Sequence, residues 1–121
     1  MLQGLRAGNM IRIKQVKQGS ATVLIVESPL VGDVTGALRD KLHGCLEAGD
    51  LSLILDFQQV AYVDSMALEM LLHCARLARR KGGALKIAQV TSTCQDIFTV
   101  TRLEHVLEIY PDLSNAMQSF L

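Results

Sequence analysis

The sequence contains few aromatic residues, no tryptophan and no excess of charge of either sign. Aromatic residues make up 4% of the 121 residues, so the stacking surfaces used to bind single-stranded nucleic acids are mostly missing. Twelve lysines and arginines balance twelve aspartates and glutamates, which gives a formal net charge of zero. Attraction to phosphate backbones and anionic lipids grows with accumulated positive charge. The composition therefore argues against direct nucleic-acid binding and against a membrane-surface protein.

Paired cysteines and long apolar runs are also absent. Cys45, Cys74 and Cys94 are odd in number, far apart and outside any CxxC pair, so neither a disulfide framework nor a thiolate zinc cluster is expected. No apolar stretch reaches the ~18 residues of a membrane span. Residues 1–9 lack the apolar segment of a signal peptide. We therefore expect a cytoplasmic protein without membrane insertion.

Apolar residues are abundant, and their amount fits one folded domain. Half of the residues are hydrophobic and 20% are charged, which excludes intrinsic disorder. A chain of this length forms one domain with its own core. We predict a single domain over residues 10–121, preceded by residues 1–9 as a flexible leader.

Hydrophobic periodicity predicts strands that alternate with helices. Residues 11–17 alternate apolar and charged side chains, and the apolar run 21–27 follows a Gly-Ser turn, so the two form a β-hairpin. Further strands are predicted at residues 51–56, 84–89 and 106–110, and helices at 33–48, 65–81, 93–101 and 112–120. This order predicts an α/β fold: a mainly parallel mixed sheet of about five strands with an N-terminal β-hairpin and four helices.

The carboxyl ends of the strands are where function is expected, because open α/β sheets bind their ligands at that edge. Segments 56–65 and 90–93 should lie there. Ser65 follows Asp64 at the start of a predicted helix, where a serine is an N-cap whose oxygen accepts a backbone N–H. A phosphate on Ser65 would meet the positive end of the helix dipole and present new negative charge to a partner.

Several segments together resemble the STAS domain of bacterial anti-sigma factor antagonists. The resemblance rests on residues 53–57 (LILDF), 60–68 (VAYVDSMAL), 79–85 (RRKGGAL) and 109–112 (IYPD), together with Gly32-Asp33 and Thr91-Ser92. It extends from about residue 11 to the end of the chain. Its most specific part is Asp64-Ser65 at a helix start, with Asp56 eight residues earlier and a Gly-Gly pair after the helix.

The resemblance implies a regulatory switch rather than an enzyme, with no catalytic residue, metal or cofactor. In that family the serine that matches Ser65 is phosphorylated by a partner kinase that is itself an anti-sigma factor. The unphosphorylated form binds this kinase and frees the sigma factor for transcription, and a phosphatase resets the system. We expect a monomer or weak homodimer whose partner-binding surface comprises Asp33, Asp64, Met66, Glu69, Thr91, Ser92 and Thr93.

Two positions depart from the family pattern. Met66-Ala67 stands where the family has a small Ser-Gly pair after the phosphoacceptor, so the surface beside Ser65 is bulkier. Arg102 stands where a glycine commonly precedes the last strand. Either the turn at Arg102 differs, or a non-glycine residue adopts a positive φ there.

Two other functions remain open on the sequence. Apolar Met66 beside Ser65 suits permanent packing, so the chain could be a constitutive STAS adaptor subunit of a transporter ATPase or of a stress-signalling assembly. Asp56 at a strand end resembles the aspartate of a phosphorelay protein. That chemistry needs Mg²⁺ held by further acids and a lysine after the last strand, and residues 109–111 are not followed by lysine. We interpret Asp56 as an orienting residue that accepts loop N–H groups near Ser65.

The histidines do not predict a metal site. His43, His73 and His105 lack the i, i+4 spacing that directs two ligands of a helix at one ion. Buried cysteines and surface histidines are the expected arrangement.

Overall fold

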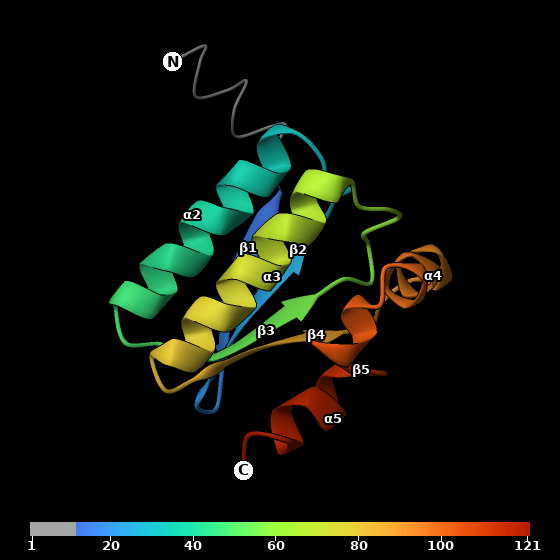
Figure 1. Cartoon of the computed structure of the whole chain (residues 1–121). Helices are drawn as coiled ribbons and strands as arrows, with labels where there is room; N and C mark the ends of the chain where they lie inside the picture. The colour runs from blue at the N-terminus through green and yellow to red at the C-terminus, as the bar shows by residue number, and fades with distance from the viewer. Residues whose placement is uncertain (1–11) are drawn as a thin grey trace.

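The computed structural model describes residues 12–121, so the predicted leader at residues 1–9 lies outside the described part (Figure 1). The elements in chain order are β1 (Ile13–Gln18), β2 (Ala21–Val26), α2 (Asp33–Glu47), β3 (Ser52–Asp56), α3 (Ser65–Arg80), β4 (Ala84–Ala88), α4 (Ser92–Val100), η1 (Leu103–His105), β5 (Glu108–Tyr110) and α5 (Leu113–Gln118). This confirms the predicted α/β fold. Within residues 12–121, no helix has the length and apolar character needed to cross a bilayer.

The five strands form one sheet in the order β1-β2-β3-β4-β5. β1 pairs antiparallel with β2 through the predicted hairpin, in which Gln18 lies opposite Ala21. The remaining neighbours are parallel. Because β2 to β5 run in the same direction, their carboxyl ends and the loops that follow lie at one edge of the sheet.

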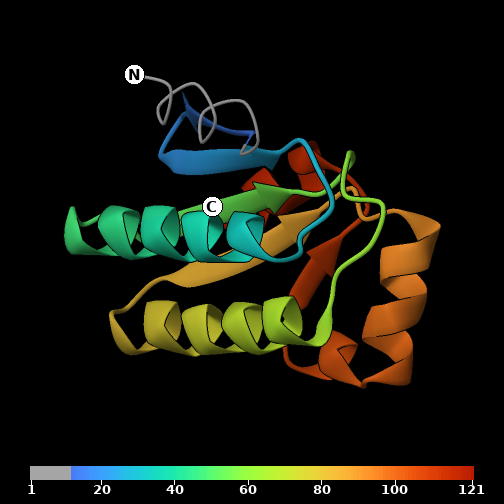
Figure 2. The same cartoon turned by 90° about the horizontal axis from the view of Figure 1, so that it is seen from above.

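Helices cover both faces of the sheet (Figures 1 and 2), and alternate side chains of a strand point to opposite faces. Leu53 and Leu55 of β3 belong to the main core with residues of α2, α3 and α4. Ile54, between them, packs with Ala116 of α5 on the other face. α5 contacts β3, β4 and β5, which places this short helix on one half of its face of the sheet.

The predicted stop of α3 is confirmed, and it uses both glycines. Gly82 adopts φ +91°, and its N–H donates to the carbonyl of Arg79, while the N–H of Gly83 donates to the carbonyl of Ala78. These are the two bonds of a Schellman ending. A Cβ on Gly83 would lie 2.2 Å from the carbonyl oxygen of Leu51. Gly83, which has no side chain, therefore allows the turn after α3 to pack directly against Leu51, the residue before β3.

The segment between α4 and β5 was only partly predicted. Arg102 has φ 63°, so the second of the two expected alternatives is correct: a non-glycine residue takes the left-handed conformation. A short 3₁₀ helix, η1, follows it, and the N–H of Leu107 donates to the carbonyl of Leu103. β5 therefore begins at Glu108 rather than at residue 106, because the preceding residues complete this turn.

A lysine on the sheet holds α5 in place, a feature that sequence analysis missed. Lys86 of β4 is only 5% exposed. Its Nζ donates to Ser119 Oγ at 2.7 Å, forms an ion pair with Glu108 at 3.5 Å and lies 4.0 Å from the ring centre of Phe120. The apolar stem of a lysine can cover a sheet while its charge is satisfied nearby. Lys86 therefore joins the sheet to the C-terminal segment.

The three cysteines are buried and free, as the sequence predicted. Burial raises the pKa of Cys45, Cys74 and Cys94, in the case of Cys74 to about 11. Such thiols act as small apolar core residues.

Candidate functional site

The starts of α2 and α3 lie together at the carboxyl edge of the sheet. Leu30 and Val63 form an isolated parallel bridge. The N–H of Leu30 donates to the carbonyl of Tyr62 at 3.1 Å, and the N–H of Asp64 donates to the carbonyl of Leu30 at 3.4 Å. The segments just before the two helices are thereby joined, so the first turns of α2 and α3 contribute to one surface.

Ser65 is the first residue of α3, and Asp64 is its N-cap. Asp64 has extended backbone angles, and its carboxylate accepts the N–H of Ala67 at 2.8 Å. The expectation that Ser65 caps the helix is therefore wrong, because the cap must be the last extended residue and that residue is Asp64. The side chain of Ser65 is exposed and lies outside the cap.

Two large apolar side chains within three residues of Ser65 in the chain are exposed. Tyr62 is 48% exposed and Met66 is 72% exposed. Glu69, one turn further along α3, is also exposed. Met66 and Glu69 were predicted from the sequence, whereas Tyr62 was not, although an aromatic residue two positions before Asp-Ser in a loop was the available signal.

Met66 and Asp33 line the same hollow, which has a volume of about 440 Å³ and lies beside the first turn of α2. Arg39 and Asp40 also line it and form an exposed ion pair of 3.4 Å. Gly32 is the N-cap of α2 and provides no side chain for the cap. The structure thus places Asp33 and Met66, two predicted partner-binding residues, on one surface.

The three hydroxyl residues at the start of α4 differ in their surroundings. Thr91 is the N-cap: its hydroxyl accepts the N–H of Cys94 at 3.3 Å and donates to the carbonyl of Val60 at 3.0 Å. Ser92 and Thr93 are exposed. The hydroxyl of Thr91 is therefore used inside the protein, whereas those of Ser92 and Thr93 face outward.

Asp56 lies at the end of β3 and is 7% exposed. One carboxylate oxygen accepts the backbone N–H of Gln58 at 3.0 Å and the side-chain N–H of Gln89 at 2.9 Å. The bond from Gln58 is of the expected kind, but it holds the beginning of the loop rather than the end that carries Ser65. Gln89 itself has φ 63°, and no sequence signal had identified it.

His43 and His73 approach each other across α2 and α3, with ring centres 6.0 Å apart. His73 and His105 are exposed as expected, whereas His43 is half-buried. In the part of the chain that the structure describes, no group of three or more His, Cys, Asp or Glu side chains is arranged to hold a metal ion.

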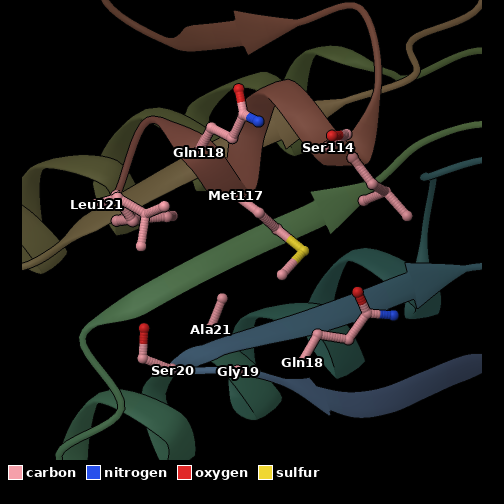
Figure 3. A pocket seen from close by; sticks show the side chains of 10 residues that line it. Gln18, Gly19, Ser20, Ala21, Ser114, Met117, Gln118 and Leu121 are labelled. Carbon is pink, nitrogen blue, oxygen red and sulfur yellow. The ribbon is translucent and has the colours of Figure 1, made fainter.

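A separate apolar hollow of about 430 Å³ lies near the β1–β2 turn, at the other end of the strands (Figure 3). Ala21 of β2 and Met117 of α5 line it, together with Leu121. Gln18 and Gln118 lie at its sides. This hollow is a different surface from the one that carries Ser65.

Comparisons with known proteins agree with this architecture. The model of the STAS domain family matches residues 12–116. An anti-sigma factor antagonist from Mycobacterium paratuberculosis superposes with a TM-score of 0.78 and 19% sequence identity, covering 90% of this chain and 92% of that one. The unphosphorylated form of the anti-sigma factor antagonist SpoIIAA gives a TM-score of 0.67 at 14% identity, covering 91% and 96%. SpoIIAA from Bacillus in its phosphorylated form gives 0.68 at 15% identity, covering 92% and 99%. Through its sequence match over residues 12–116 and its shared fold, the chain belongs to the STAS domain family.

Proposed function

We propose that this STAS domain is an anti-sigma factor antagonist that binds an anti-sigma factor with serine kinase activity and is switched off by phosphorylation of Ser65. The observation that carries the proposal is the exposed Ser65 at the first position of α3, next to an aspartate that already caps the helix. The protein would regulate transcription in the cytoplasm through protein contacts, without catalysis or nucleic-acid binding. A phosphatase would restore the active form, and the protein would be a monomer or weak homodimer.

The position of Ser65 suits a phosphate physically. The first turn of a 16-residue helix carries partial positive charge and has N–H groups without intrahelical partners. Because the Asp64 side chain performs the capping, phosphorylation of Ser65 would not remove the cap. Among the similar structures, SpoIIAA occurs in both an unphosphorylated and a phosphorylated form.

The surroundings of Ser65 suit a switch that releases a partner. Tyr62 and Met66 provide exposed apolar area on both sides of the serine, and such side chains commonly anchor protein interfaces. Acidic side chains lie near Ser65 along the chain, at Asp64 and Glu69, and Asp33 lines the hollow that Met66 also lines. A phosphate adds about 1.5–2 negative charges. Burying those charges against a partner fitted to the uncharged serine would be costly, so the complex would dissociate.

The test is phosphorylation by a purified anti-sigma kinase, with Mg-ATP and intact-mass measurement. One added phosphate is expected on the wild-type protein and none on Ser65→Ala. Ser92→Ala is the matched control, since Ser92 is also an exposed first residue of a helix. Calorimetry should then show that the kinase binds the unphosphorylated protein and that binding weakens at least about tenfold after phosphorylation. Phosphate retained on Ser65→Ala would contradict the mechanism.

A second function, a constitutive adaptor of a transporter ATPase or stress-signalling assembly, is favoured by the 72% exposure of Met66. A methionine can remain packed against a partner of varied shape. In that case partner binding would be the same for the wild-type protein and for Ser65→Asp, but would be lost in Met66→Asp. The same calorimetric measurement distinguishes the two functions.

A further inference from the structure

The loop that leads to Ser65, residues 57–64, is fastened to a segment more than 30 residues away. We call that segment the β4–α4 junction and define it as Gln89, Thr91 and Cys94. Gln89 donates to Asp56 at 2.9 Å, just before the loop. The hydroxyl of Thr91 donates to the carbonyl of Val60 at 3.0 Å, and the thiol of Cys94 lies 3.3 Å from the same oxygen. The loop is thus held near its start and at its middle.

Gln89 occupies a backbone conformation that needs an explanation. Its φ of 63° is in the left-handed region, which glycine, asparagine and aspartate adopt more readily than glutamine. Such a residue persists where its surroundings fix it, and the bond to Asp56 is one such constraint. Asp56 is nearly buried and needs its donors, because a buried carboxylate without hydrogen bonds is costly. The hydrogen bond therefore stabilises both the conformation of Gln89 and the buried carboxylate of Asp56.

The hydrogen bonds from the β4–α4 junction hold a loop in which some residues are buried and others face outward. Phe57 and Val60 are fully buried. Gln58, Gln59 and Ala61 are exposed between and after them, and Tyr62 is 48% exposed. Val60 is held by both Thr91 and Cys94, and the carbonyl of Tyr62, two residues later, accepts the N–H of Leu30. The chain that leads into Tyr62 is therefore held on the side of the β4–α4 junction at Val60.

We infer that Gln89 and Thr91 are positioning residues: the β4–α4 junction fixes the loop before α3 and so sets how Ser65 and Tyr62 are presented to a partner. The second half of this inference rests on the proposed function; the first half does not. Thr91 then belongs to the internal support of the site rather than to its contact surface.

The first test is amide hydrogen exchange measured by NMR on the full chain. Gln89→Ala and Thr91→Val should each speed exchange of the amides of Gln58 and Val60, which donate to Asp56 and Phe57, by about tenfold or more, the effect of losing a hydrogen bond to a charged or buried group. Amides in the middle of α2 should change less than twofold. Unchanged loop exchange in both variants, or equal acceleration in α2, would overturn the inference.

A conservative substitution provides the control. In Asp56→Asn, the asparagine oxygen can take the place of the single carboxylate oxygen that accepts both the backbone N–H of Gln58 and the side-chain N–H of Gln89. Loop exchange in Asp56→Asn should stay within about threefold of the wild-type rate, whereas Gln89→Glu places two carboxylates together and should loosen the loop. An Asp56→Asn variant as loose as Gln89→Glu would contradict the pairing.

The second test separates this inference from the proposed function. Gln89→Ala should lower kcat/KM for phosphorylation of Ser65 several-fold, whereas the conservative Asp56→Asn should lower it less than twofold. If the loop loosens in Gln89→Ala but no kinase modifies wild-type Ser65, the proposed function fails and the positioning role stands. If Ser65 is phosphorylated at the wild-type rate in Gln89→Ala and loop exchange is unchanged, the positioning role fails and the proposed function stands.

Discussion

The carboxylate of Asp64 accepts the N–H of Ala67 at 2.8 Å, which makes Asp64 the cap of α3 and leaves Ser65 outside it. A single serine could both cap the helix and present its hydroxyl, but here the cap is Asp64 and the exposed hydroxyl belongs to Ser65. Asp64 stabilises the helix start, and Ser65 is free to be modified. This division has a direct consequence for stability.

Asp64→Ala should lower the free energy of unfolding by about 1 kcal/mol, because the N–H of Ala67 loses its acceptor. Ser65→Ala should change it by less than about 0.5 kcal/mol, as expected for an exposed residue outside the cap. Urea unfolding followed by circular dichroism measures both. Asp64→Asn is the control, since asparagine is also a good cap. A larger loss in Ser65→Ala than in Asp64→Ala would contradict the assignment.

Alanine at two glycines should have opposite effects. Gly83→Ala would place its Cβ 2.2 Å from the carbonyl oxygen of Leu51 and should destabilise the protein by about 1–3 kcal/mol, as overpacking does. Gly44→Ala, in the middle of α2 with open space around the new methyl group, should stabilise by about 0.5–1 kcal/mol because it raises helix propensity. The pair is compared by thermal and urea unfolding, and a stabilising Gly83→Ala would rule out the close approach.

Lys86→Ala should loosen α5. The variant loses the bond to Ser119, the ion pair with Glu108 and the contact with Phe120, so we expect a loss of about 2 kcal/mol. In Lys86→Ala, the amides of residues 113–118 should exchange faster than in the wild type, whereas those of α2 should not change. Lys17→Ala is the matched control: Lys17 also pairs with an acid, Asp50 at 3.2 Å, but is exposed, and its loss should cost less than about 1 kcal/mol.

The stability of the protein should fall between pH 9 and pH 11. Burial raises the pKa of Cys74 from 9.0 to about 11, so the folded protein keeps the proton that the unfolded chain loses above pH 9. The raised pKa therefore contributes stability below pH 9 that disappears as the pH approaches 11, by up to roughly 2–3 kcal/mol. Cys74→Ala should show a flatter decline over this range. An identical slope in wild type and variant would contradict the prediction.

If the proposed function is correct, Tyr62→Ala and Met66→Ala should each weaken binding of the proposed anti-sigma partner by about tenfold while leaving stability within about 0.5 kcal/mol, because exposed apolar anchors contribute mainly to interfaces. Val100→Ala is the matched control: Val100 is 81% exposed and lies at the end of α4, away from Ser65 in the chain. Calorimetric titration measures the affinities. Equal weakening in all three variants would argue against an interface centred on Ser65.

Much of the fold follows from local patterns. The apolar runs of β2 and β3 and the helical spacing of α3 each reflect which side chains must be buried. The alternation in β1 predicted a strand correctly, although all its residues after Ile13 are exposed. The parallel sheet then follows from the order of the elements. The start of β5 was misplaced because η1 is a short turn stabilised by its own backbone bonds, with no periodicity to reveal it.

The candidate site also has a part that could be predicted from the sequence and a part that could not. An Asp-Ser pair that opens a helix at the carboxyl edge of the sheet was predictable from the sequence, because capping preferences and strand ends are local properties. The folded structure was needed to show that Asp64 rather than Ser65 caps α3, that Tyr62 is exposed, and that Gln89 and Thr91 hold the loop before Ser65. Asp64 and Ser65 are both good capping residues, so the backbone angles decide between them. The contacts of the loop join residues 31 to 33 positions apart, and the exposure of Tyr62 depends on what covers its side chain. Neither leaves a periodic trace in the sequence.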